Sequence, residues 1–220
     1  MPALPALTGP VHPPAKGGAP KKLVVLLHGL GADGSDLIGL APAWAPLLPD
    51  AEFVSPDAPF ACDFSPFGRQ WFSFQSRAPE HVLAGVREAA PILDNFLTEA
   101  LKARGLAAKD MALVGFSQGT MMSLYVGLRR KEAVAGILGF SGRLLAPELL
   151  AKELGSRPPV FLVHGDADPV VPFESLTLAM TGLKANGIAC EQLVRPGLGH
   201  GIDEEGLRRG GHFLRDKLSL

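Results

Sequence analysis

The sequence predicts a single α/β domain built on a mainly parallel, doubly wound sheet with helices on both faces. Short, continuous apolar runs alternate with longer amphipathic stretches, which is the pattern of buried parallel strands joined by crossover helices. A length of 220 residues fits one such domain with a sizeable core. No remaining stretch is long enough to form a large lid domain.

Six apolar runs are expected to be the strands, at residues 23–27, 52–55, 111–116, 134–140, 160–163 and 188–194. Between them, apolar side chains recur every three or four residues, which predicts helices over 82–105, 117–131, 172–186 and 203–218. A further helix is expected to begin near Ser35 or Asp36. Gly105 and Gly187 are typical helix stops, and Pro172 suits a first helical turn. Right-handed crossovers would join these elements.

Residues 1–20 are expected to form a proline-rich arm before a domain at 21–220. Six prolines in the arm disfavour both helix and central strand. The first residues have no basic segment and prolines interrupt any apolar run, so they do not resemble a signal peptide, and a cytoplasmic protein is expected. No apolar run approaches the roughly 20 residues that span a bilayer, so stable membrane insertion is not expected.

Charge and cysteine content argue against several classes of function. A formal net charge of -1 gives no long-range field that would favour nucleic acid. Cys62 and Cys190 stand far apart, without a Cys-x-x-Cys spacing or a His/Cys cluster, so neither a disulfide framework nor a metal site is expected. A small-molecule substrate follows as the expectation. The sequence does not decide the oligomeric state, and a homodimer stays open.

Ser117 lies between two glycines, Gly115 and Gly119, directly after the apolar run at 111–116 and before a predicted helix. This arrangement indicates a nucleophile elbow, in which a strand turns at once into a helix and holds the serine in a strained conformation. Side chains at the two glycine positions would collide with neighbouring backbone. The motif alone is weak evidence, because short glycine patterns also occur by chance.

Two further strand ends carry residues that suit serine chemistry. Asp168 follows the run at 160–163, and His200 follows the last run, between two glycines. A serine hydroxyl needs a neutral imidazole to accept its proton, and the imidazole needs a carboxylate on its other nitrogen. His200 is the predicted base and Asp168 the predicted acid, with Asp166 as the main rival. The order serine, acid, histidine is that of α/β-hydrolases.

Other polar residues at strand ends have simpler explanations. His28 and His164 each precede a glycine and are expected to bond to backbone. Ser141 also follows a strand, but Arg143 stands where an elbow would need its second glycine.

The loop after the first predicted strand is rich in glycine and supports two interpretations. In a hydrolase it would supply the backbone N–H of Leu30, which with that of Gln118 would bind the oxyanion. Gly29, Gly31 and Gly34 also spell a dinucleotide fingerprint, with Asp57 after the next strand as its acidic residue. Prolines in the intervening helical region, and a carboxylate at position 33 beside the phosphate site, make that alternative the weaker one.

Six aromatic residues lie between positions 60 and 74, in a stretch without helical periodicity. A long loop that concentrates apolar rings can form the wall of an acyl-binding pocket. Phe64, Trp71 and Phe72 are the predicted substrate-binding residues. The alternative is a hydrophobic cluster that merely anchors the loop.

Taken together, the motifs resemble the phospholipase/carboxylesterase family of α/β-hydrolases, which includes the acyl-protein thioesterases, and the bacterial carboxylesterase branch most of all. The matching segments are LVVLLHGLGADG at 23–34, GRQWFS at 68–73, LVGFSQG at 113–119, HGDADPVVP at 164–172 and GLGHG at 197–201.

The resemblance implies Ser117 as nucleophile, Asp168 as acid, His200 as base, the backbone of Leu30 and Gln118 as oxyanion hole, and no metal or organic cofactor. It implies hydrolysis of short- to medium-chain carboxylic esters, with acyl-protein thioesterase or lysophospholipase activity as alternatives. A dinucleotide-binding oxidoreductase and a non-catalytic binding protein of the same fold are the alternatives from other classes. Met121 and its neighbours stand where relatives commonly have smaller residues, which would narrow the acyl site.

Overall fold

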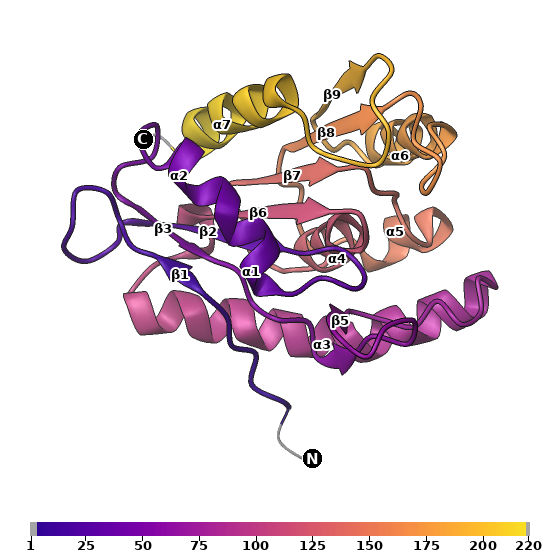
Figure 1. Ribbon diagram of the computed structural model, residues 1–220, viewed down its shortest axis with the longest axis horizontal. Coiled ribbons are helices and arrows are strands. Elements are labelled where there is room, and N and C mark those ends of the chain that lie inside the picture. The colour runs from indigo at the N-terminus through magenta and orange to yellow at the C-terminus, as the bar shows by residue number, and fades with distance from the viewer. Residues whose placement is uncertain (1–3, 219–220) are drawn as a thin grey trace.

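Seven strands form one sheet in the order β1-β3-β2-β6-β7-β8-β9 (Figure 1). The computed structural model describes residues 4–218, so the first three residues of the predicted arm and residues 219–220 lie outside the described part. β1 pairs antiparallel with β3, and the other neighbours in this sheet are parallel. The strands are β1 Val11–His12, β2 Lys22–Leu27, β3 Ala51–Val54, β6 Met111–Phe116, β7 Gly136–Phe140, β8 Val160–Gly165 and β9 Cys190–Arg195.

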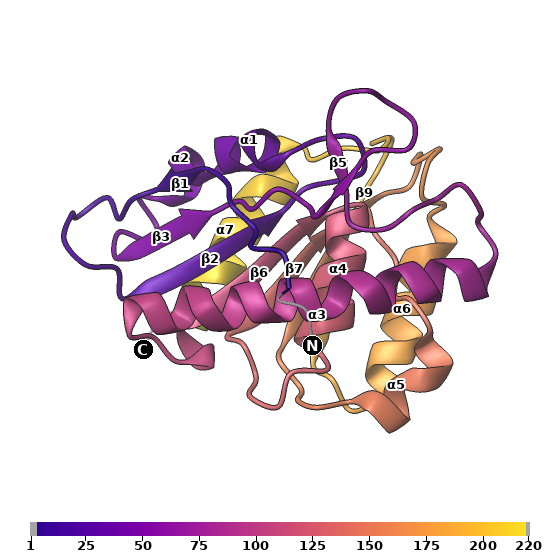
Figure 2. The ribbon, with the colours of Figure 1, turned by 90° about the horizontal axis from the view of Figure 1, so that it is seen from below.

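Helices cover both faces of the sheet, as predicted (Figure 2). One face carries α3 Pro79–Arg104, α4 Gln118–Gly127, α5 Pro147–Glu153 and α6 Glu174–Ala185, and the other carries α1 Gly34–Leu37, α2 Ala41–Trp44 and α7 Glu204–Leu218. Short 3₁₀ turns lie at Ile38–Leu40 and Ala108–Asp110. The predicted doubly wound, mainly parallel architecture is therefore confirmed. No helix within residues 4–218 is both long and apolar enough to cross a membrane.

Alternating side chains of the central strands supply two hydrophobic cores. In β2, Leu23, Val25 and Leu27 face the α3 and α4 side, whereas Val24 and Leu26 face the α2 and α7 side. All five are fully buried, and each fully buried aliphatic side chain stabilises the fold by about 1.5–3 kcal/mol. Burial on both faces explains why these strands read as unbroken apolar runs. The same burial holds β6 and β8 in place, and Ser117 and Asp168 follow the carboxyl ends of these two strands.

The prediction that the domain begins at residue 21 is wrong. Val11 pairs with Val54, and the carbonyl oxygens of Thr8 and Pro10 accept hydrogen bonds from the backbone beyond β3. A Cβ on Gly9 would lie 2.0 Å from the Ser55 carbonyl oxygen, so the chain approaches closely there. Proline does exclude central strands, but an edge strand tolerates it.

Besides β1, further short structures were not predicted from the sequence. Phe60–Ala61 (β4) and Arg69–Gln70 (β5) form an antiparallel pair within the aromatic stretch. α5 begins at Pro147, where proline's fixed φ suits the first helical position. Strands of two residues are too short to show a period, and α5 is a seven-residue helix that gives only a weak one.

Candidate active site

Ser117 occupies the sharp turn between β6 and α4. Its backbone has φ 52° and ψ -114°, a conformation that costs a non-glycine residue energy and that concentrates at functional sites. A Cβ on Gly119 would lie 1.8 Å from the Leu27 carbonyl oxygen, and one on Gly115 would lie 2.3 Å from the Thr120 nitrogen. Both flanking positions therefore need glycine, as the elbow interpretation requires. The Ser117 N–H donates to the Phe140 carbonyl at 2.9 Å, which ties the turn to β7.

Asp168 and His200 meet although 32 residues separate them in the chain. His200 Nδ1 lies 2.7 Å from Asp168 Oδ2. The other carboxylate oxygen accepts the backbone N–H groups of Val170 and Val171 at 2.8 and 2.9 Å. Burial alone would raise the pKa of Asp168, but the hydrogen bonds from His200, Val171 and Val170 outweigh it and hold that pKa below its usual value. The carboxylate is therefore ionised at neutral pH.

Backbone contacts hold the loops of the two residues together. The Ala167 N–H donates to the Leu198 carbonyl at 3.1 Å. A Cβ on Gly165 would lie 2.1 Å from that same carbonyl oxygen. At the base of the histidine loop, Arg195 Nε donates to Asp203 Oδ2 at 2.7 Å, which links the end of β9 to the start of α7. The loop from 196 to 203 is thus held at both ends.

Ser117 and His200 line one cavity of about 490 Å³, a volume within the range of small-molecule sites. The Phe116 ring packs against the His200 ring at a centroid distance of 4.8 Å. Within the described residues, no hydrogen bond joins the Ser117 hydroxyl to the imidazole. Such bonds are often long in unliganded enzymes and tighten when substrate binds.

The rival residues have other partners. Asp166 Oδ1 accepts the Gly197 N–H at 2.6 Å and braces the histidine loop instead of contacting the imidazole. His28 Nδ1 lies 2.7 Å from the Gly29 carbonyl, and His164 Nε2 lies 2.9 Å from the Val171 carbonyl, so both histidines bond to backbone as predicted. Ser141 is fully enclosed, and its hydroxyl has no hydrogen-bond partner in the described structure.

The loop that carries Leu30 borders the same cavity. Backbone hydrogen bonds attach it to β5: the Gly31 N–H donates to the Arg69 carbonyl at 2.9 Å, and the Arg69 N–H donates to the Ala32 carbonyl at 2.7 Å. A Cβ on Gly68 would lie 2.0 Å from the Gly31 carbonyl oxygen. Gln118 is the first residue of α4, where backbone N–H groups have no partner inside the helix. Both predicted oxyanion donors therefore belong to segments with fixed backbones.

The prediction that Trp71 and Phe72 bind substrate is wrong, because both are core residues. Their side chains are fully buried and do not line the cavity. The Trp71 indole N–H donates to the His28 carbonyl at 3.0 Å. The buried Gln118 side chain accepts the Trp71 backbone N–H at 2.8 Å and donates to the Phe72 carbonyl at 2.7 Å. These two rings anchor the loop, which is the alternative that the sequence left open.

Phe64 does line the cavity, and the residue is 62% exposed. Of the methionines that follow the elbow, Met121 reaches the cavity, whereas Met122 is buried in the core. Phe74, another of the six clustered aromatic residues, also lines the cavity. Sequence reasoning did not assign several other lining residues, which are Arg77, Phe116, Arg143, Val170, Val171, Pro172 and Ser175. They come from four separate segments, and only their arrangement in the fold identifies them.

The geometry argues against a dinucleotide site. Gly34 N donates to Asp57 Oδ1 at 2.8 Å, and Ser35 N donates to Asp33 Oδ1 at 2.8 Å, so two carboxylates occupy the start of α1. A pyrophosphate needs those backbone N–H groups for itself. Among residues 4–218, no three His, Cys, Asp or Glu side chains gather in a way that could hold a metal ion.

Comparison with known proteins gives consistent matches over nearly the whole chain. The sequence profile described as Phospholipase/Carboxylesterase matches residues 14–218. The crystal structure of esterase PE8 superposes with a TM-score of 0.93 at 45% identity, covering 97% of this chain and all of the other. Esterase YpfH of Escherichia coli is 30% identical over 196 residues, 89% of this chain and 82% of its own length. Acyl-protein thioesterase 1 of Neurospora crassa is 29% identical over 212 residues, 89% and 86% of the two chains.

Proposed function

Because this chain belongs to the phospholipase/carboxylesterase family and is an esterase with the α/β-hydrolase fold, we propose that Ser117, His200 and Asp168 form its catalytic triad. The reaction is hydrolysis of short- to medium-chain carboxylic esters by way of an acyl-enzyme. The observation that carries the proposal is the pair of His200 and Asp168 at 2.7 Å beside a strained serine that lines the same cavity.

In the acylation step, the Ser117 oxygen attacks the ester carbonyl and His200 Nε2 accepts the hydroxyl proton. Asp168 holds the proton on Nδ1 and stabilises the imidazolium that forms. The tetrahedral intermediate then collapses, the bond to the alcohol oxygen breaks, and His200 returns the proton to the leaving alkoxide. The products are the free alcohol and an acyl group on the Ser117 oxygen.

The backbone N–H groups of Leu30 and Gln118 donate hydrogen bonds to the negatively charged oxygen of the intermediate. The Gln118 N–H lies at the positive end of α4, which favours an anion. Loss of one such donor typically costs about 3–4 kcal/mol of transition-state stabilisation. In deacylation, water replaces the serine as nucleophile and His200 takes its proton. The acyl–oxygen bond to Ser117 then breaks, His200 returns the proton to the Ser117 oxygen, and the carboxylic acid leaves.

Hydrolysis of short p-nitrophenyl esters by the wild-type protein and by Ser117→Ala tests whether Ser117 is the nucleophile. We expect wild-type turnover and a loss on the order of 10⁴-fold or more in the variant. Equal activity of the two proteins would refute the assignment.

Thioesterase activity is the second candidate, and the named relative from Neurospora crassa supports it. The same triad would attack a thioester carbonyl with a thiol as the leaving group. Parallel measurement of kcat/KM on an ester and a thioester with the same acyl group separates the two candidates.

A further inference from the structure

Two arginines, Arg77 and Arg143, line the cavity that contains Ser117 and have no carboxylate partner among residues 4–218. Arg77 lies in the loop before α3, and Arg143 lies in the loop after β7. Arg77 is exposed and Arg143 is half-buried. In the described part of the chain, neither guanidinium forms an ion pair, and the buried Nε–H of Arg143 has no hydrogen-bond partner. The Arg143 guanidinium carbon lies 5.9 Å from the centroid of the Phe74 ring.

Most of the other partly buried arginines are neutralised by carboxylates, whereas Arg69 donates to the backbone carbonyls of Ala58 and Pro59. Arg104 pairs with Glu52, Arg129 with Glu153, and Arg195 with Asp203. Leaving a half-buried cation without a counter-charge is unfavourable, and a second cation nearby adds repulsion. Burial and the positive charge of Arg77 both lower the pKa of the Arg143 guanidinium, as expected for two uncompensated like charges. A bound anion would remove both costs.

The position of Arg143 relative to the nucleophile limits where such an anion can lie. A Cβ on the adjacent Gly142 would lie 3.1 Å from the Ser117 carbonyl oxygen, so this loop passes directly beside the elbow. Both arginines also line a neighbouring hollow of about 790 Å³, and they therefore lie where the two spaces meet. Its wall includes Leu83 and Leu144 but also the carboxylates of Glu80 and Glu148. An anion is therefore expected on the Ser117 side of the two arginines, where no lining residue is acidic.

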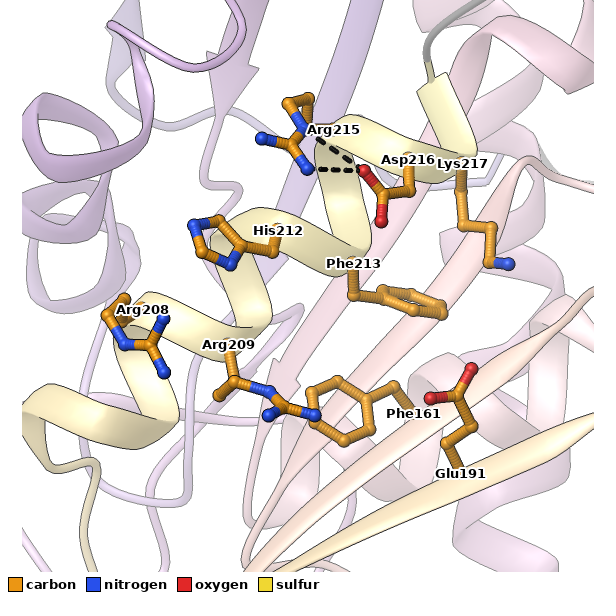
Figure 3. A pocket seen from close by; sticks show the side chains of 9 residues that line it. All are labelled: Phe161, Glu191, Arg208, Arg209, His212, Phe213, Arg215, Asp216 and Lys217. Atoms are coloured by element: carbon orange, nitrogen blue, oxygen red, sulfur yellow. Dashed lines mark hydrogen bonds and ion pairs between the residues drawn. The ribbon is translucent and has the colours of Figure 1, made fainter.

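In a second cluster of cations, the arginines have carboxylates close by. Figure 3 shows a hollow along α7 that is lined by Arg208, Arg215 and the carboxylates of Asp216 and Glu191. Arg215 pairs with Asp216, and Arg208 pairs with Glu205. An anion there would meet carboxylates, whereas the cavity beside Ser117 has none among its lining residues.

We propose that Arg143 and Arg77 bind an anionic group of the substrate, a carboxylate or phosphate, a few bonds from the ester that Ser117 attacks. This inference rests on the proposed function and specifies its substrate class as anionic esters. Guanidinium groups suit both anions because they offer paired N–H donors. Because the whole chain has a formal net charge of -1, a preference for anionic esters would come from these two arginines and not from a generally basic surface.

The test compares kcat/KM for monomethyl adipate with kcat/KM for its neutral monoamide, in which a carboxamide of the same size replaces the remote carboxylate. We expect the wild type to favour the anionic ester by about tenfold or more, because hydrogen bonds from a guanidinium to an anion are stronger than those to a neutral group. The anionic-to-neutral ratio should fall by about tenfold in Arg143→Gln and also decrease in Arg77→Gln. Arg143→Lys should recover part of it.

Arg209→Gln is the matched control, since Arg209 is an exposed arginine of the α7 hollow, outside the cavity. Its anionic-to-neutral ratio should equal that of the wild type. A third ester, methyl 5-phosphonopentanoate, distinguishes the two anions: a higher kcat/KM than that of monomethyl adipate assigns the site to phosphate-like groups, and a lower one to carboxylates.

An enzyme that hydrolyses p-nitrophenyl butyrate but shows no preference for either anionic ester, or whose preference survives both Arg→Gln substitutions, overturns this inference and leaves the proposed function intact. An enzyme that hydrolyses no ester at all overturns the proposed function, and this inference with it.

Discussion

Asp168 Oδ2 lies 2.7 Å from His200 Nδ1, with the Asp168 side chain fully buried and the His200 side chain 18% exposed. The carboxylate can thus fix the imidazole tautomer from the protein side while the other ring nitrogen remains available at the cavity. We expect Asp168→Asn to lower kcat for a p-nitrophenyl ester by about 10⁴-fold, because an amide can favour the wrong tautomer.

Asp166→Asn is the control for that substitution. Asp166 contacts the backbone of Gly197 and not the imidazole, so its kcat should stay within about tenfold of the wild-type value. If the two variants lost activity equally, Asp168 would not be the specific partner of the histidine.

Gly119→Ala tests the packing of the elbow. The new methyl group would lie 1.8 Å from the Leu27 carbonyl oxygen, and β2 cannot move away without disturbing the central sheet. We expect the free energy of unfolding to fall by at least about 2 kcal/mol, measured by urea denaturation. Gly39→Ala is the matched control, because a Cβ there meets no atom within 4 Å, and it should change stability by less than about 1 kcal/mol. Similar losses in both variants would contradict the close approach at the elbow.

The ionised Asp203 side chain, which pairs with Arg195 next to the His200 loop, should make the free energy of unfolding depend on pH. Burial raises the pKa of Asp203, but hydrogen bonds from Arg195 and the Gly206 N–H outweigh it, so its folded-state pKa lies below the usual value. An acid with a depressed pKa stabilises the fold above its unfolded pKa of about 3.9, and this contribution is lost as the pH falls through the folded pKa.

Asp203→Asn keeps a capping side chain but removes the charge. At pH 7 we expect the wild type to be more stable than this variant by about 0.5–1 kcal/mol. The difference should be constant above about pH 5 and shrink below about pH 4. In an Arg195→Gln background the same substitution should matter less. A difference that does not change between pH 7 and pH 3 would contradict the role given to the charge.

The parts of this protein that could be predicted from sequence are those marked by a pattern within a short stretch of the chain. The continuous apolar run at 111–116 identified β6, and its end placed Ser117 at a turn. Asp168 and His200 could be predicted for the same reason, since residues just after parallel strands meet at one edge of a sheet. The order of these three residues along the chain then restricted the chemistry.

Features that depend on packing could not be predicted in this way. An aromatic residue in a loop can face either a cavity or a core. The sequence does not show that the Gln118 side chain forms hydrogen bonds with the backbone of Trp71 and Phe72. The pairing of Val11 with Val54 joins segments on either side of β2. Arg143 differs from most other partly buried arginines because no carboxylate within residues 4–218 pairs with it, and this depends on its neighbours in space.

The central claim is that Ser117 is a nucleophile activated within this cavity, and active-site labelling tests it most directly. The wild-type protein is treated with a fluorophosphonate, digested, and mapped by mass spectrometry. We expect a single phosphonylated residue, Ser117, with labelling abolished in Ser117→Ala and retained in Ser141→Ala. Absence of labelling in the folded wild-type protein, or labelling at another serine, would contradict the account.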